Sequence, residues 1–253
     1  MGIIRDMATV GCELFLLLSK KSTIQVNDTR NFTVLRHILV PAMGYPWSIA
    51  ACVQHNCLYI SGPASKCTHR IALSNNSITT WELHGTPYFL SVTRNHTVLS
   101  TMRNSRKICE CTTHGDLVRE INLVASIDQP RYAFEHSASR FVVSFESPTQ
   151  HRVCVVDTSG HIIHSYNQAP STSSAQLKAP CSLAVNDHGN VFVVYRLDDR
   201  VQMLSSKLAY LGDVIISGEK LKEPQSIHFD EARGRLYIAE ASGRLIVASL
   251  ITA

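Results

Sequence analysis

The stretch Pro180-Cys-Ser-Leu-Ala-Val-Asn-Asp-His-Gly-Asn-Val-Phe-Val-Val-Tyr195 decides the fold of this protein. Residues 182–185 alternate in character and residues 191–195 are almost wholly apolar, so both segments are predicted to be β-strands. The Asn-Asp-His-Gly-Asn segment between them tolerates the positive φ angles that a tight turn requires. A third strand is predicted at 200–204 and a fourth at 208–216, which gives one four-stranded antiparallel sheet.

A proline opens a similar segment five times, at intervals of about 40 to 50 residues. These prolines are Pro46, Pro87, Pro130, Pro180 and Pro224. Such a period is typical of propeller blades, and a chain of 253 residues has room for about six units of 42 residues if the N-terminal stretch supplies one. We therefore predict an all-β fold, a six-bladed β-propeller of four-stranded antiparallel blades.

The whole chain is predicted to be one domain, because no linker, composition shift or charge block divides residues 1–253. Its blades are expected at about 7–41, 42–83, 84–124, 125–168, 176–217 and 220–253. The last blade runs out of sequence after its third strand. We expect residues 1–6, through Ile3 and Ile4, to supply its outer strand, so that the N- and C-terminal strands close the ring within one blade.

The best-preserved repeats resemble the NHL repeat. They consist of Pro-x-x-Leu/Ile, a turn, Gly-Asn-Val-Phe-Val, a loop and Arg-Val-Gln, and the resemblance is strongest over residues 180–250. It implies a six-bladed propeller similar to the C-terminal domain of tripartite-motif proteins, some of which bind RNA. The family also includes lyases and scaffold proteins. Its members usually place Asp directly after the second strand, where this sequence has Gly62, Met102, Phe145, Tyr195 and Glu240.

The resemblance also bears on the kind of function expected. No RING finger, B-box or coiled coil is recognisable in the sequence. A role in a ubiquitin-ligase system would therefore be limited to recognising the substrate. We predict a non-catalytic binding or scaffold propeller.

The loops between second and third strands carry positive charge, in a chain with a formal net charge of +4 and a pI of about 8.6. In a propeller these loops lie on one face. Converging cations there would attract a protein or a single-stranded RNA. The candidate binding residues are Lys20, Lys21, Lys66, Arg103, Arg106, Lys107, Arg152, Arg196, Arg200 and, at the mouth of a basic loop, Tyr195.

Some of these cations have a structural alternative. Lys107, Arg152 and Arg200 each stand immediately before a third strand. A residue type that recurs at one repeat position more often stabilises the blade itself than binds a ligand. Arg103 and Arg106 show no such recurrence, so we expect them to be the better binding candidates.

Aromatic residues also have two interpretations. Trp47, Tyr88 and Tyr132 lie just after opening prolines and Tyr195 ends a second strand. They could stack on unpaired bases. Packing is the more common role, because aromatic side chains dominate core burial.

Catalysis would require a different set of residues. An enzymatic propeller with a metal in its channel needs carboxylates, Asn or His that project inward from first strands. The first strands here offer Ser48, Ser91, Ser182, Ser226 and His228, with no acid in their interiors. We therefore expect no cofactor, no metal and no enzymatic activity. The alternatives are a metal-dependent hydrolase or lyase of the same fold, and a degenerate scaffold without a specific site.

The eight cysteines form no C-x-x-C pair, and this spacing favours buried free thiols in a reducing compartment. The longest apolar run, 14–18, is too short for a bilayer, which needs roughly 20 apolar residues. We expect a cytoplasmic protein that makes no membrane contact and is monomeric as an isolated domain.

Overall fold

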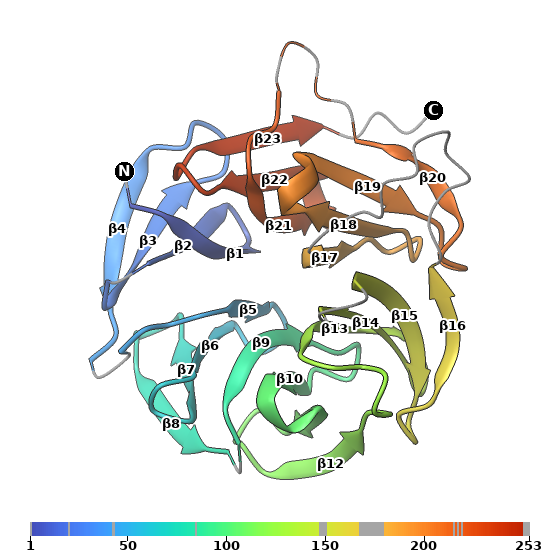
Figure 1. Cartoon of the computed structure of the whole chain (residues 1–253). Coiled ribbons are helices and arrows are strands. Elements are labelled where there is room, and N and C mark those ends of the chain that lie inside the picture. Colours follow the sequence, from blue (N-terminus) through green and yellow to red (C-terminus); the bar gives the residue numbers. More distant parts are fainter. Residues whose placement is uncertain are drawn as a thin grey trace.

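The computed structural model describes residues 2–19, 21–41, 44–83, 85–146, 151–166, 180–214, 216, 218 and 220–249. Six small sheets form a ring around a central axis, and the first blade lies beside the last (Figure 1). This arrangement confirms the predicted all-β, six-bladed propeller. The helices of the described residues are three short 3-10 turns, η1 (Arg103–Ser105), η2 (Arg196–Asp198) and η3 (Glu231–Arg233). None of them is long or apolar enough to cross a membrane.

Five blades have four antiparallel strands that follow one another in sequence order. In each blade the first strand lies nearest the axis and the last lies at the rim (Figure 1). Blades one to three contain β1 (Ile4–Val10), β2 (Glu13–Leu18), β3 (Thr23–Asp28) and β4 (Val34–Leu39); β5 (Ile49–Cys52), β6 (Cys57–Gly62), β7 (Cys67–Ala72) and β8 (Ile78–Glu82); and β9 (Pro87–Val92), β10 (Val98–Met102), β11 (Lys107–Cys111) and β12 (Leu117–Asn122). Blades four and five contain β13 (Pro130–Ser137), β14 (Arg140–Glu146), β15 (His151–Asp157) and β16 (Ile162–Tyr166); and β17 (Pro180–Val185), β18 (Val191–Tyr195), β19 (Arg200–Leu204) and β20 (Tyr210–Asp213).

The predicted closure of blade six by the N-terminus is wrong. Within the described residues this blade has three strands, β21 (Pro224–Asp230), β22 (Arg235–Glu240) and β23 (Leu245–Ser249). Ile4 instead begins β1, where it is paired with Leu18 of blade one. Its side chain is fully buried in an apolar cluster shared with Tyr237 and Ala239 of blade six. The burial of Ile4 between the two blades explains why it belongs to an inner strand and not to an outer one.

The second strands form the apolar layer of each blade. All five residues of β18 are buried, as are all residues of β6 and β10. Apolar clusters join neighbouring blades; for example, Phe192 and Val194 of blade five pack with Ile227 and Ile238 of blade six. The unbroken apolar run in the sequence therefore reflects packing on both faces of the blade.

The first strands share an irregularity that positions the candidate site. The pairing of β1, β17 and β21 with their second strands shifts register directly after the opening residue. A related shift follows Pro130 in β13. A β-bulge leaves one residue out of the ladder and re-aims its side chain. The bulged residues are Arg5, Cys181 and Gln225, and Arg131 lies within the shift of β13.

Candidate functional site

One end of the central channel opens into a cavity of about 310 Å³ that four arginines line. These arginines are Arg5, Arg103, Arg131 and Arg196. The rest of the wall consists of Trp47, Phe89, Cys181, Leu197 and Gln225. We call this cavity the arginine mouth.

Two different repeat positions supply the four guanidinium groups. Arg5 and Arg131 directly follow the first residues of β1 and β13, where the bulges turn side chains out of the ladder. Arg103 and Arg196 are the first residues of η1 and η2, immediately after second strands. Each blade presents both positions at the same end of the channel, so residues distant in sequence converge there.

Hydrogen bonds and aromatic contacts hold Arg5, Arg103 and Arg196 in place. The guanidinium carbon of Arg5 lies 4.8 Å from the centre of the Trp47 ring. Arg103 donates a hydrogen bond of 2.5 Å to the Gln129 side chain. Arg196 forms an ion pair of 2.7 Å with Glu223, and both side chains are partly exposed. A surface pair of this kind contributes little to stability, so Arg196 can still be recruited by a ligand.

The electrostatics of the mouth favour anions. Burial lowers the pKa of Arg5, and the positive charge of Arg196 lowers it further. Arginine nevertheless keeps its proton at neutral pH, so the mouth has a fixed positive charge and no proton to exchange. Guanidinium groups bind carboxylates or phosphates through paired hydrogen bonds. The four arginines can therefore bind an anion.

Four of the sequence-predicted cations divide into two pairs in the structure. Arg103 and Arg196 line the mouth, whereas Lys107 pairs with Glu120 at 2.8 Å and Arg200 pairs with Asp213 at 3.4 Å. Lys107 and Arg200 thus stabilise their own blades, because each ion pair joins the third strand of a blade to its fourth.

Four of the remaining predicted cations are described, and they lie outside the lining of the mouth. Lys66 and Arg106 occupy left-handed turn positions with φ of 53° and 51°, and both are exposed. Lys21 is exposed, and Arg152 is half-buried opposite Phe145. Lys20 lies outside the described residues.

The aromatic candidates are mainly packing residues. Tyr195 is only 3% exposed, which favours a packing role over its predicted role in binding. Tyr132 is 4% exposed and lies against Phe89, with ring centres 4.2 Å apart. Trp47 is half-buried and makes an edge contact with Tyr88. Of this group, Trp47 is the one that lines the mouth.

We did not identify Arg5 and Arg131 as binding candidates from the sequence, although their position in the repeat indicated them. Both directly follow the opening position of a repeat, which is Ile4 in blade one and Pro130 in blade four. The expectation that Arg103 has no counterpart is also wrong, because Arg196 begins η2 as Arg103 begins η1.

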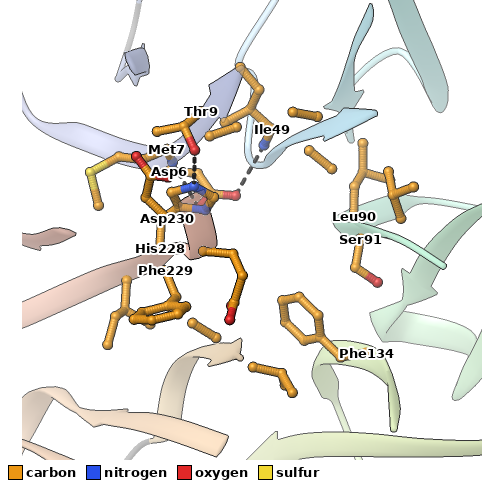
Figure 2. Close-up of a pocket in the computed structure, with 18 of the residues that line it drawn as sticks. Asp6, Met7, Thr9, Ile49, Leu90, Ser91, Phe134, His228, Phe229 and Asp230 are labelled. Atoms are coloured by element: carbon orange, nitrogen blue, oxygen red, sulfur yellow. Dashed lines mark hydrogen bonds between the residues drawn. The ribbon is translucent and has the colours of Figure 1, made fainter. Parts of the chain in front are cut away.

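An acid does lie in the interior of a first strand, contrary to the sequence-based expectation. Asp6 of β1 is 3% exposed and accepts hydrogen bonds from the hydroxyls of Ser48 and Ser226 at 2.6 and 3.0 Å. The backbone amides of Met7 and Ile49 each donate a further bond of 3.0 Å to it (Figure 2). Burial raises the pKa of Asp6 to about 6 even though these bonds favour the ionised form.

Asp6 is thus a bridge between blades. Its four donors come from blades one, two and six.

Among the residues that the structure describes, no group of three His, Cys, Asp or Glu side chains could hold a metal ion. All eight cysteines are free thiols, and all except Cys12 are buried.

Comparison with known proteins defines the structural class. No family model and no curated protein matches the sequence. The chain is similar in structure to Kuenenia stuttgartiensis hydrazine synthase, with a TM-score of 0.73 and 12% identity over 99% of this chain and 96% of that one. It is also similar to virginiamycin B lyase from Staphylococcus aureus, solved with quinupristin, with a TM-score of 0.72 and 15% identity over 98% and 80% of the two chains.

A third similar structure is the Cps50 (Swd1) β-propeller domain of Myceliophteria thermophila, with a TM-score of 0.65 and 12% identity over 99% and 98% of the two chains. At these identities the likeness shows the fold alone. The protein is therefore a six-bladed β-propeller. These neighbours come from other propeller families, so the resemblance to NHL repeats stays a prediction.

Proposed function

We propose that this propeller is a non-catalytic binding module that takes an acidic segment of a protein partner into the arginine mouth. The observation that carries the proposal is the convergence of Arg5, Arg103, Arg131 and Arg196 on one cavity. Clustered guanidinium groups raise the local concentration of anions and bind carboxylates in fixed geometry.

The distribution of charge around the mouth favours a peptide over RNA. An RNA strand needs a continuous positive track along its backbone. Beyond the mouth, Lys107 and Arg200 are paired with acids of their own blades. The apolar wall, which includes Trp47 and Leu197, suits the hydrophobic neighbours of acidic residues in a peptide.

One finer role belongs to this proposal, and one class of protein competes with it. The partner could be the substrate of a ubiquitin-ligase system in which this propeller recognises substrates. A metal-dependent hydrolase or lyase is the competing class, since virginiamycin B lyase is among the structural neighbours. Elemental analysis of the purified protein separates the classes, because stoichiometric metal would favour the enzyme.

The direct test uses a fluorescent hexaglutamate peptide, with hexalysine and a ten-nucleotide oligouridylate as comparison probes, in anisotropy titrations. We expect hexaglutamate to bind and the double variant Arg103→Gln/Arg196→Gln to weaken binding by about tenfold or more. Arg106→Gln is the matched control, because Arg106 lies in the same loop as Arg103 but outside the lining of the mouth.

Two results would contradict the proposal. The first is hexaglutamate affinity that is equal in the wild type and the double variant. The second is tighter binding of oligouridylate than of hexaglutamate, which would make RNA the partner. Circular dichroism melting curves of every variant would confirm that the fold is retained.

A further inference from the structure

We infer that the opposite end of the channel is a second binding site, which takes a small apolar molecule carrying a cationic group. A cavity of about 510 Å³ opens there, lined by the later residues of the same first strands. Figure 2 shows its side chains converging from several blades. This site is separate from the arginine mouth and does not depend on the function proposed for it.

The wall of this second cavity is mainly apolar. Ile49, Leu90, Leu183 and Ile227 line it and are each no more than 3% exposed. Because these residues belong to β5, β9, β17 and β21, the ring holds their side chains in a fixed arrangement. Pockets of a few hundred Å³ with apolar walls and a few polar groups are typical of small-molecule sites.

Two phenylalanines give the cavity an aromatic character. Phe134 and Phe229 are both partly exposed and lie on opposite sides of the cavity (Figure 2). The faces of aromatic rings attract cations, and the attraction grows when water is excluded. These rings would accept either a flat apolar body or an ammonium group.

The charged groups of the cavity are carboxylates. Asp6, Asp230 and Glu231 line it, and its lining contains no Lys or Arg in the described part of the chain. His228 also lines it, but burial lowers the pKa of this imidazole to about 4, so it is neutral at pH 7. An anion would therefore meet repulsion here, whereas the same field would attract a cation.

Glu231 is the carboxylate placed to meet such a cation. Asp6 is saturated by its four donors, and Asp230 is 3% exposed and paired with Arg233 at 3.1 Å. Glu231 is exposed and accepts one backbone hydrogen bond, from Asp187 at 3.1 Å. Partial burial and the nearby Asp187 charge raise the pKa of Glu231, and an ammonium group would offset both effects.

Three probes with one aromatic body and different charges test this inference. They are naphthylethylammonium, naphthylethanol and naphthylacetate, titrated into the full chain by calorimetry at pH 7. We expect the ammonium probe to bind most tightly, the alcohol about fivefold or more weakly and the carboxylate most weakly at this site.

Two substitutions connect the binding to the cavity. Glu231→Gln should lower the affinity for the ammonium probe by about fivefold and leave the affinity for the alcohol unchanged, because the substitution removes only the charge. Phe134→Leu keeps an apolar side chain but removes the aromatic ring, and should reduce the preference for the ammonium probe over the alcohol. Glu82→Gln is the matched control, since Glu82 is an exposed carboxylate in the outer strand of blade two.

Several outcomes would overturn the inference. One is the absence of binding heat when the ammonium probe is titrated to millimolar concentration. Another is equal affinity for the ammonium and alcohol probes, which would reject the cationic class. A third is an affinity for the ammonium probe that is the same in the wild type, Glu231→Gln and Phe134→Leu. That result would place the binding outside this cavity. The hexaglutamate titration reports on the arginine mouth separately, so failure of one site is distinguishable from failure of the other.

Discussion

The carboxylate of Asp6 accepts a hydrogen bond of 3.0 Å from the hydroxyl of Ser226, a residue 220 positions away in the sequence. This bond joins the first blade to the last. Further polar contacts cross the same boundary. Among them, Gln225 donates to the carbonyl oxygen of Ile4 at 2.7 Å, and the His228 ring lies 2.8 Å from the Thr9 hydroxyl. Side chains, together with the apolar cluster around Ile4, thus hold the two ends of the ring together.

Replacing Asp6 should destabilise the whole ring. In Asp6→Ala the hydroxyls of Ser48 and Ser226 and the Ile49 amide lose their acceptor in a buried place. Leaving buried donors without an acceptor should lower the free energy of unfolding by about 2–4 kcal/mol. Urea denaturation followed by tryptophan fluorescence measures this change. Asp187→Ala, at an exposed position, should stay within about 0.5 kcal/mol of the wild type, and an equally small loss in Asp6→Ala would show that the bridge does not stabilise the ring.

The pH dependence of stability should reveal two opposing buried groups. The pKa of Asp6 rises from 3.8 to about 6 on folding, so its contribution to stability is present at low pH and is lost as pH rises. The pKa of His228 falls from 6.5 to about 4, so its contribution is present at high pH and is lost as pH falls. Between about pH 4 and 6 the two slopes offset each other, each amounting to about 2–3 kcal/mol.

Single variants separate these slopes. Relative to the wild type, Asp6→Asn should lose stability as pH falls from 6.5 to 4, because only the His228 slope remains. His228→Asn should instead gain relative stability over the same range. Urea denaturation at half-unit pH intervals measures both. Parallel pH profiles for the wild type and the two variants would be inconsistent with these assignments.

Gly160 should resist substitution because of its neighbour in the adjacent blade. It adopts φ of 78°, and a Cβ atom there would collide with the carbonyl oxygen of Asn122 in blade three. We expect Gly160→Ala to lower the free energy of unfolding by more than about 2 kcal/mol. Gly234→Ala is the control, since Gly234 also has positive φ, 58°, but has open space around it. Both variants strain the backbone, but only Gly160→Ala adds the collision. Equal losses in the free energy of unfolding would therefore rule out the collision.

Salt should weaken ligand binding at the arginine mouth. The affinity for hexaglutamate should fall steeply with sodium chloride concentration, because the Debye length shortens from about 10 Å at 0.1 M to 3 Å at 1 M. The double variant Arg5→Gln/Arg131→Gln should show a shallower dependence, since half of the guanidinium groups of the mouth are gone. Anisotropy titrations at several salt concentrations measure both slopes. A salt dependence that the double variant leaves unaltered would place the binding away from the mouth.

The sequence by itself determined the repeat and therefore the architecture. Recurring opening prolines and apolar second strands, such as 191–195, report local strand geometry and two-sided packing. Both properties leave a period in the sequence because each blade repeats the same local environment. The positions of Arg103 and Arg196 on one loop face followed from the same repeat.

Only the tertiary structure decided how the ring closes and which cations converge. Ile4 pairs with Leu18 of the first blade, while its side chain packs in a cluster with Tyr237 of the last, far away in the chain. The bulges that bring Arg5 and Arg131 beside Arg196 depend on strand register, which a residue pattern of period two does not specify at a strand's first residues. The closure of the ring and the convergence of the arginines both depend on contacts between blades. A sequence encodes the structure of each blade far more directly than the distances between blades.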